Sequence, residues 1–140
     1  LGEEPLVESV RTYDLGRSEH LTRALGRLGA LVVKPRAGHG GQGVVIGSRC
    51  TREEREGAAA AITARPDRFV AQETVALSRH PTVCGGRLAP RHVDLRAFAF
   101  VSGGDVTLMP GGLTRVALGE GDLIVNSSRN GGGKDTWVVG

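Results

Sequence analysis

The 140 residues fit one domain or part of one, and a content of 39% hydrophobic and 24% charged residues argues against wholesale disorder. The net charge is only +3, from interspersed charges, and no apolar run approaches the roughly 20 residues that span a bilayer, so the sequence predicts neither a nucleic-acid nor a membrane partner. The 22 glycines, about twice the usual share, cluster in short runs that exclude collagen and predict tight turns.

The first part of the chain predicts a helix between strands. Ser18 is expected to cap a helix that ends at Gly29 and presents regularly spaced leucines on one face. A glycine-rich loop, residues 38–43, lies between two short β-branched segments, which predicts a β-hairpin. The strands expected in this part cover residues 6–14, 30–33 and 44–46.

The middle of the chain begins with a second helix. Thr51 and Glu54 form a capping box, and the helix has to stop before Pro66. Residues 69–73 predict a strand, whereas residues 78–88 contain proline and glycine and predict a loop.

The last third predicts mainly strands. Residues 91–101 alternate in a period of two, with Asp94 and Arg96 on one face together with His92, Phe98 and Phe100, and with Val93, Leu95, Ala97, Ala99 and Val101 on the other. A turn is expected at Gly103 and Gly104, and a glycine-rich loop at residues 130–133. Further strands are expected at residues 105–109, 113–118, 123–126 and 136–139. The predicted fold class is α+β, a mostly antiparallel sheet with two helices and a glycine-rich flap.

The glycine loop reads Gly38-His39-Gly40-Gly41-Gln42-Gly43, a G-x-G-x-x-G string. A strand follows it instead of a helix, which argues against a dinucleotide fingerprint, and Asp135 after Gly133-Lys134 argues against a Walker A loop. What remains is a strand–loop–strand flap whose backbone N–H groups are suited to phosphate oxygens, with Lys34 on the incoming strand. The alternative is a flexible hairpin with an exposed lysine.

Six sequence blocks occur in a fixed order along nearly all of the chain. They are Val33-Lys34-Pro35, the glycine loop, Phe69 to Glu73, His92 to Arg96, Gly111 to Leu118, and Val125 to Ser128 with Gly132 to Trp137. In this the sequence closely resembles the circularly permuted ATP-grasp proteins, the group that includes glutathionylspermidine synthetase-like sequences. The resemblance implies an ATP-grasp fold and an ATP-dependent carboxylate–amine ligase that works through an acyl phosphate.

The resemblance also implies roles for individual residues. Lys34 would contact the nucleotide phosphates and residues 38–43 would cover them, while Gln72, Glu73, Thr74 and Val75 would form the hinge that reads adenine. Asp94 and Arg96 resemble the D-x-R strand of these ligases, and Arg115 resembles the arginine one hairpin later; both arginines would stabilise charge on the transferring phosphoryl group. The alternatives are an exposed strand end for Gln72 and Glu73, and an ion pair on a solvated face for Asp94 and Arg96.

The magnesium ligands of the family precede its lysine and are absent from these residues. Residues 1–140 are therefore expected to be the C-terminal portion of a permuted ATP-grasp domain, whose upstream portion would bind Mg²⁺. ATP and Mg²⁺ are the implied cofactors, and carboxylate and amine small molecules or peptides the implied substrates. An isolated piece would be at best a nucleotide binder, and a non-catalytic nucleotide-binding or regulatory module is the alternative, as is a plain scaffold whose glycine loops are mere turns.

Several chemistry-bearing residues receive no firm role from the sequence. His39 and His92 lack an identifiable orienting carboxylate, and Asn126 lacks the acidic neighbour of a magnesium ligand. The roles of Lys134 and Asp135 also stay open. Cys50 and Cys84 have neither Cys-x-x-Cys spacing nor a histidine at ligand spacing, which argues against zinc and favours reduced thiols in a cytoplasmic protein.

Overall fold

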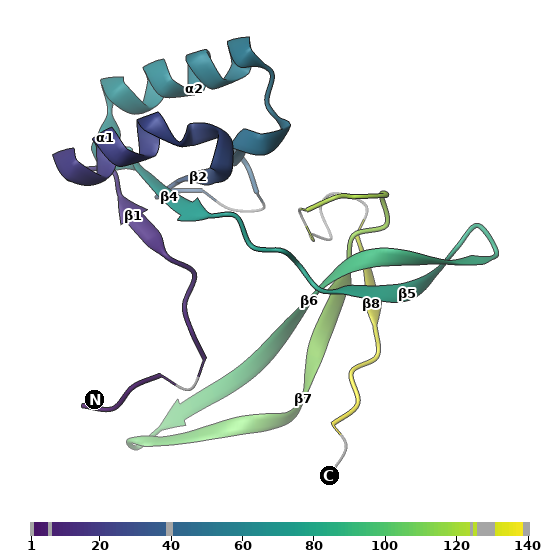
Figure 1. Cartoon of the computed structure of the whole chain (residues 1–140). Helices are drawn as coiled ribbons and strands as arrows, with labels where there is room; N and C mark the ends of the chain where they lie inside the picture. The colour runs from purple at the N-terminus through teal and green to yellow at the C-terminus, as the bar shows by residue number, and fades with distance from the viewer. Residues whose placement is uncertain (1, 6, 39–40, 124, 126–130, 139–140) are drawn as a thin grey trace. The chain divides into compact units, whose positions relative to one another are not determined.

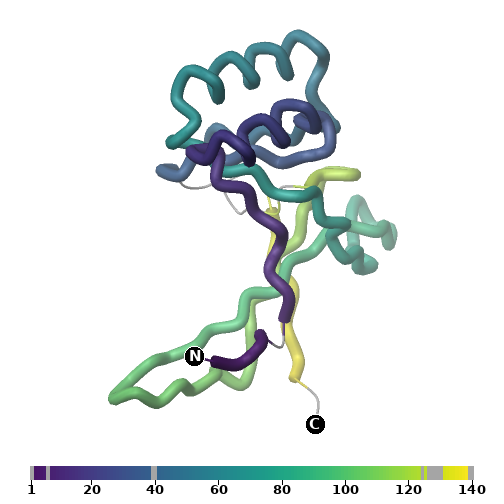
Figure 2. Tube along the Cα trace, turned by 60° about the vertical axis from the view of Figure 1, so that its left-hand side comes forward, coloured from purple at the N-terminus to yellow at the C-terminus, as the bar shows by residue number. Residues whose placement is uncertain are grey.

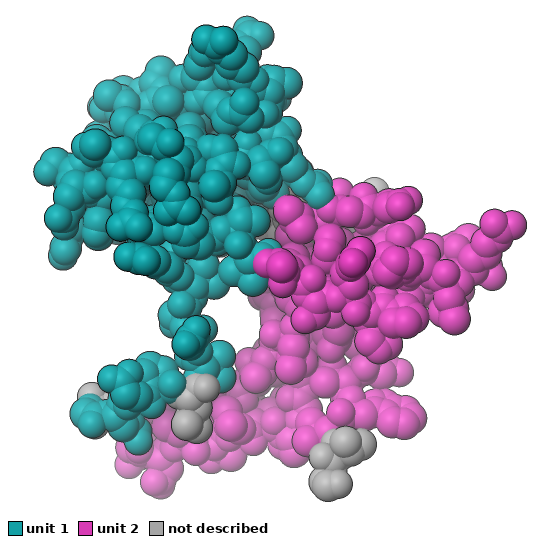
Figure 3. Space-filling model, viewed as in Figure 1, with its two compact units in different colours: residues 1–75 teal, residues 76–140 magenta. Residues whose placement is uncertain are grey.

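The structure, a computed structural model, describes residues 2–5, 7–38, 41–123, 125 and 131–138. The chain divides into two compact units, residues 1–75 and 76–140 (Figure 3). The described residues form two helices, both in the first unit, and two four-stranded sheets, one in each unit (Figure 1). Every strand pair is antiparallel, so the α+β prediction is confirmed, with two sheets where one was expected.

The sheet of the first unit has the strand order β1-β4-β2-β3. Its strands are β1 (Thr12–Asp14), β2 (Leu31–Pro35), β3 (Val45–Ile46) and β4 (Phe69–Glu73). Val33 lies opposite Val45, so the hairpin predicted around the glycine loop is confirmed.

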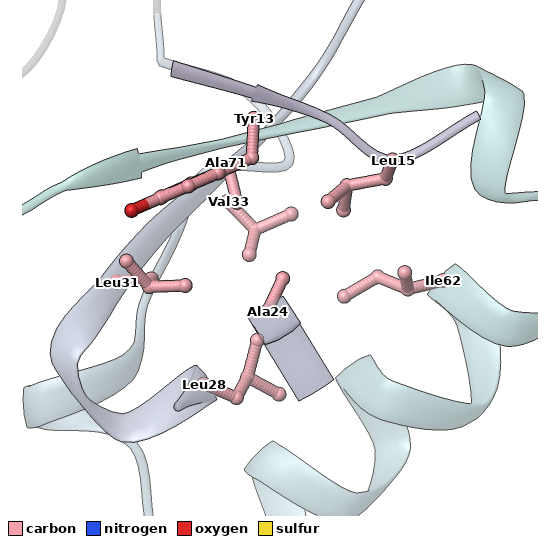
Figure 4. Close-up of a cluster of buried hydrophobic side chains, with 8 residues drawn as sticks. All are labelled: Tyr13, Leu15, Ala24, Leu28, Leu31, Val33, Ile62 and Ala71. Carbon is pink, nitrogen blue, oxygen red and sulfur yellow. The ribbon is translucent and has the colours of Figure 1, made fainter. Parts of the chain in front are cut away.

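Two helices, α1 (Ser18–Gly26) and α2 (Arg52–Ala64), cover one face of this sheet. Figure 4 shows side chains from both helices and three strands converging on one apolar core. The buried members of the core are Tyr13, Leu15, Ala24, Leu28, Leu31, Val33, Ile62 and Ala71. Because side chains alternate along a strand, the neighbours of these core residues lie on the opposite, open face of the sheet.

The helix ends follow the sequence signals only in part. The capping box of α2 is confirmed: the Glu54 N–H donates to Thr51 Oγ1 at 3.2 Å, and the Thr51 N–H donates to Glu54 Oε2 at 2.7 Å. The cap predicted for α1 is wrong, since Ser18 is the first helical residue and Arg17 occupies the N-cap position without a side-chain hydrogen bond. Helix α1 also ends at Gly26, and a 3-10 turn, η1 (Leu28–Ala30), leads into β2.

Two further 3-10 turns complete the first unit, η2 (Gly47–Arg49) and η3 (Pro66–Arg68). Gly47 is buried against η1, and a Cβ there would overlap the Leu28 carbonyl oxygen. The close approach of η1 and η2 therefore needs a residue without a side chain at this position.

The sheet of the second unit has the order β5-β6-β7-β8. Its strands are β5 (Arg79–Cys84), β6 (Arg87–Ser102), β7 (Asp105–Val116) and β8 (Gly132–Lys134). Strands β6 and β7 run side by side as a long two-stranded arm (Figures 1 and 2), and Gly103 and Gly104 turn its tip with φ of 60° and 93°, as predicted.

Several strand predictions for this unit are wrong. Residues 78–88, expected to be a loop, are the hairpin of β5 and β6, because Gly85 and Gly86 form its turn and Pro81 is tolerated in a strand at the sheet edge. The two strands expected at 105–109 and 113–118 are one strand, β7, with a register shift opposite Ala97–Ala99.

At the C-terminal end the expected loop contributes a strand, since Gly132 and Gly133 belong to β8. The strands expected at residues 123–126 and 136–139 are not formed by the described residues there, Leu123, Val125 and Thr136 to Val138. Ile124, Asn126 and Val139 lie outside the described residues.

Candidate functional site

A row of polar side chains crosses the open face of the first sheet. Lys34 Nζ donates to Gln72 Oε1 at 2.5 Å, and Gln72 Nε2 donates to Thr12 Oγ1 at 2.9 Å. The row thus links β2, β4 and β1 on the side away from the helices. An ammonium group has three donors and Gln72 takes one of them, so the amide orients a cation at an exposed position without neutralising it.

A second cation lies along the same face, next to the end of β2. Arg36 Nη2 donates to Asp14 Oδ1, and the same carboxylate oxygen accepts the Gly16 N–H at 2.9 Å. The bonds from Gly16 and Arg36 hold the pKa of Asp14 below its ordinary value. Asp14 therefore stays ionised and compensates Arg36, whereas the Lys34 ammonium is bound by a neutral amide.

The glycine loop joins β2 to β3 directly after this cationic face. Gly38, Gly41 and Gly43 have φ of 154°, 79° and 71°, a region that residues with a side chain rarely adopt. A Cβ at Gly43 would also lie 3.2 Å from Pro35 Cγ. His39 and Gly40 lie outside the described residues, so the course of the loop is described on both sides of them and the coverage of phosphates by residues 38–43 stays a prediction.

The four residues of the predicted hinge point in different directions. Gln72 belongs to the open face, whereas Glu73 lies opposite Leu31 and faces the helices. The Glu73 carboxylate accepts from Tyr13 Oη at 2.6 Å and from both terminal nitrogens of Arg27, at 2.9 and 3.2 Å. The Tyr13 hydroxyl and then the Arg27 guanidinium hold the pKa of Glu73 below its ordinary value, so the group is an anion at neutral pH.

Two further hydrogen bonds join the hinge to backbone carbonyl groups of neighbouring segments. Thr74 Oγ1 donates to the Ala30 carbonyl at 2.9 Å, and the Glu73 N–H donates to the Arg11 carbonyl at 3.1 Å. Val75 keeps 47% of its surface exposed. Sequence reasoning missed Tyr13 and Arg27, which lie 60 and 46 residues away from Glu73, because no local signal connects positions so far apart.

A second cluster of predicted site residues lies on β6 and β7. Asp94 faces Arg115 across the strand pair, and Arg115 binds the carboxylate with Nε at 3.0 Å and Nη2 at 2.6 Å. These bonds hold the pKa of Asp94 low and raise the pKa of Arg115. Arg96 Nε lies 4.0 Å from the same carboxylate and its side chain is 52% exposed, against 13% for Arg115. The structure therefore brings all three together, with Arg115 as the main partner of Asp94.

The described residues do not fit a magnesium site. Among them, no three His, Cys, Asp or Glu side chains lie close enough together to hold a metal ion. The Asp94 carboxylate is occupied by Arg115, and His92 Nδ1 lies 2.8 Å from the Asp122 carbonyl oxygen. Lys134 Nζ donates to the Pro81 carbonyl, a contact that links β8 to β5, and Asn126 lies outside the described residues. We assign no metal to this part of the chain.

The helices that the structure describes are too short or too polar to cross a membrane. Both cysteines, Cys50 and Cys84, are free thiols, and Cys50 Sγ donates to the Ile46 carbonyl.

The sequence is similar to one protein family and to longer bacterial proteins. A family model described as circularly permuted ATP-grasp type 2 matches residues 1–117. Uncharacterised proteins of Mycobacterium leprae and Mycobacterium tuberculosis are 46% and 45% identical to the chain over 139 residues. These matches cover 99% of this chain and 25% of each relative, so the chain spans about a quarter of the length of the mycobacterial proteins.

A relative from Frankia alni carries a functional name. It is called "Putative glutamate--cysteine ligase 2-3" and is 46% identical over 138 residues, which cover 99% of this chain and 16% of that protein.

Proposed function

The chain belongs to the circularly permuted ATP-grasp type 2 family, and on that premise we propose that it supplies the nucleotide-binding part of an ATP-dependent carboxylate–amine ligase. In the proposed reaction a substrate carboxylate oxygen attacks the γ-phosphorus of ATP, which releases ADP and forms an acyl phosphate. An amine then attacks the acyl carbon and expels phosphate. The ligase name of the Frankia relative supports this reaction class, and the acid and amine remain undefined.

The observation that carries the proposal is the oriented Lys34 ammonium beside the glycine loop. Gln72 holds Nζ on the open face of the sheet, and four residues further along the chain the backbone enters left-handed glycine conformations at Gly38. A lysine acts on phosphate as a point charge, and successive backbone N–H groups in such turns form anion-binding concavities. In the proposal Lys34 binds the triphosphate and residues 38–43 close over it.

The hinge is proposed to hold the adenine ring. The Glu73 carboxylate is engaged by Tyr13 and Arg27, so it fixes the strand, and the backbone of residues 72–75 is the part suited to the adenine edge. Val75 offers an exposed apolar surface for stacking against the ring. Gln72 contributes at the other end by orienting Lys34.

The arginines of β6 and β7 are proposed to act on the transferring phosphoryl group. Arg115 donates two hydrogen bonds to the Asp94 carboxylate, which fixes the plane of its guanidinium. Arg96 is the more exposed of the two and is suited to meet an incoming anion. Fixed cations of this kind stabilise charge that spreads over the equatorial oxygens in the transition state.

Magnesium and the cellular setting complete the proposal. Bridging Mg²⁺ normally neutralises the phosphates in such reactions, and its ligands would come from outside residues 1–140, which we propose to be the C-terminal portion of the domain. The two free thiols fit the cytoplasm as the compartment.

Calorimetric titration of the 140-residue chain with ATP tests the proposal. We expect wild type to bind, and Lys34→Ala to weaken binding about tenfold or more, since a charge-assisted bond contributes about 1.5–3 kcal/mol. The matched control is Arg52→Ala, which removes an exposed cation on α2 and should leave ATP affinity unchanged. Equal affinities of wild type and Lys34→Ala would contradict the proposal.

A non-catalytic nucleotide-binding module is the second candidate function, because the polar row of Lys34 and Gln72 and the glycine hairpin would serve nucleotide binding without any transfer of phosphate. The two candidates are distinguished by an assay that includes the part of the Mycobacterium tuberculosis relative that this chain does not match. Tight ATP binding without formation of ADP, across a broad screen of acids and amines, would favour the non-catalytic module over the ligase.

A further inference from the structure

The second unit exposes apolar surface that its sequence pattern is built to bury. Leu95 and Val101 of β6 keep 65% and 74% of their surface exposed, and Val106 and Leu108 of β7 keep 65% and 67%. In the first unit, by contrast, eight buried residues form one core.

These side chains share one face of the β6–β7 arm. Leu95, Ala97, Ala99 and Val101 are alternate residues of β6, while Val106 and Leu108 lie opposite Val101 and Ala99. The register shift opposite Ala97–Ala99 lengthens β7 and leaves the alternation of β6 unbroken. We call this set, residues 95, 97, 99, 101, 106 and 108, the apolar arm face.

The opposite face of the same strands is charged near the base of the arm and partly aromatic toward its tip. It carries Asp94, Arg96 and Arg115 near the base, and Phe98 and Phe100, 43% and 60% exposed, toward the tip beside Thr107. The apolar arm face carries no charged side chain, and a continuous apolar face of a sheet normally packs against another layer. Exposed contiguous apolar patches on soluble proteins mark interaction sites.

The part of the second unit that the structure describes does not bury this face. Among the described residues of the second unit only Thr82, Val116, Ala117 and Val125 are buried, and all lie outside the arm tip. A sheet without a covering layer is marginally stable in water, so a second layer has to come from another polypeptide segment.

The length of the relatives identifies that segment. The mycobacterial proteins match 99% of this chain, and the match covers only 25% of each, so about three quarters of their own length lies outside it. We propose that the apolar arm face is the docking surface for the polypeptide that makes up this remaining three quarters. The inference does not depend on ATP binding, because it uses the face opposite Asp94 and Arg96.

Cysteine accessibility tests the proposal in two forms of the protein. One form is the 140-residue chain, and the other is the full-length Mycobacterium tuberculosis relative with its matching quarter replaced by this chain. Val101→Cys probes the apolar arm face, and Thr107→Cys, exposed on the opposite face, is the matched control. Alkylation by a maleimide is followed peptide by peptide by mass spectrometry, so that Cys50 and Cys84 do not interfere.

We expect Val101→Cys to react about tenfold or more slowly in the long form than in the short one, because a covered thiol is inaccessible, and Thr107→Cys to change much less. Equal slowing at both positions, or none at either, overturns the proposal. Protection of Val101→Cys in the short form, rising with protein concentration and accompanied by a dimer in sedimentation, would assign the face to a second copy and also overturn it.

A second measurement uses two separate polypeptides, so it does not require the long form with its replaced quarter to fold. The 140-residue chain is mixed with the complementary part of the relative, and association is followed by sedimentation velocity. We expect complex formation that Leu108→Asp weakens about tenfold or more and Thr107→Asp leaves nearly unchanged, as expected for a central apolar contact. No association of the two wild-type pieces would contradict the proposal.

Discussion

At the scale of single residues, the first sheet separates two kinds of polar group by the face they occupy. Lys34 and Gln72 lie on the open face, exposed or half-buried, and are bonded to each other. Glu73, the next residue along β4, faces the helices and is bonded to Tyr13 and Arg27. The Tyr13 ring is further flanked by the Arg11 and Arg23 guanidinium groups, 5.6 and 5.5 Å from its centroid. Adjacent residues of one strand thus have different partners: Gln72 binds the Lys34 ammonium on the open face, and Glu73 binds Tyr13 and Arg27 on the helix side.

The Glu73 contacts predict a pH dependence of stability. The pKa of Glu73 is lower in the folded chain than its ordinary value of 4.5, so its stabilising contribution is present above that value and is lost as pH falls through the folded pKa. We expect Glu73→Gln to melt at a lower temperature than wild type at pH 7, and the two melting temperatures to converge as pH falls below 4.5 and through the lowered pKa of the folded Glu73. Thermal unfolding followed by circular dichroism between pH 7 and pH 2 measures this.

The control for this prediction is Glu56→Gln, which removes a carboxylate from an exposed pair with Arg52 and should shift the melting temperature little at any pH. A Glu73→Gln deficit that is the same at pH 7 and pH 2 would show that its ionisation is not coupled to folding.

At the scale of elements, the first unit depends on a close contact between two short turns. Gly47 of η2 lies against η1, and Arg55 of α2 donates to the Gly47 and Cys50 carbonyls. Helix α2 is thereby joined to the end of the glycine hairpin. Position 47 has no room for a side chain, although nothing in the local sequence distinguishes this glycine from the others.

We expect Gly47→Ala to destabilise the chain by about 3 kcal/mol, because its Cβ would overlap the Leu28 carbonyl oxygen and lie 2.8 Å from the Leu28 carbonyl carbon. The matched control is Gly57→Ala in α2, where no atom lies within 4 Å of the new Cβ. That substitution should stabilise by about 0.5–1 kcal/mol, since alanine favours a helix interior. Chemical denaturation of both variants measures the difference, and a loss of stability in Gly57→Ala as large as that in Gly47→Ala would refute the argument.

At the scale of the whole molecule, apolar burial is distributed unevenly between the two units. The first unit has a core of eight buried residues between two helices and a sheet. In the second, few of the described residues are buried and the apolar arm face is open. A unit needs its own core to fold alone, so the two units should differ in independent stability.

We expect residues 1–75, expressed alone, to unfold in a cooperative thermal transition. We expect residues 76–140, expressed alone, to show no cooperative transition and to bind a hydrophobic dye. Circular dichroism and dye fluorescence on the two fragments provide the measurement. Leu31→Ala, which truncates a fully buried side chain, should lower the free energy of unfolding of the first fragment by about 2–5 kcal/mol. This variant is the control that shows whether the fragment folds around its native core. Cooperative unfolding of the second fragment alone would contradict the expectation.

The sequence by itself determined those features whose physical cause is local. The capping box at Thr51 and Glu54, the hairpin around the glycine loop, the turn at Gly103 and Gly104 and the alternation along β6 all follow from neighbouring residues. Where local signals conflicted, prediction failed: proline and glycine in residues 78–88 suggested a loop, and only pairing with β6 decides that β5 is a strand.

Tertiary structure alone decided which side chains meet. The bond between Lys34 and Gln72 spans 38 positions, and the contacts of Glu73 with Arg27 and Tyr13 span 46 and 60. Sheet register sets all of them, and register depends on how whole strands pair and on which face is buried. The sequence could therefore name Lys34, Gln72, Asp94 and Arg115, but only the folded sheets show that Gln72 orients the lysine, that Glu73 turns away from it, and that Arg115 is the partner of Asp94.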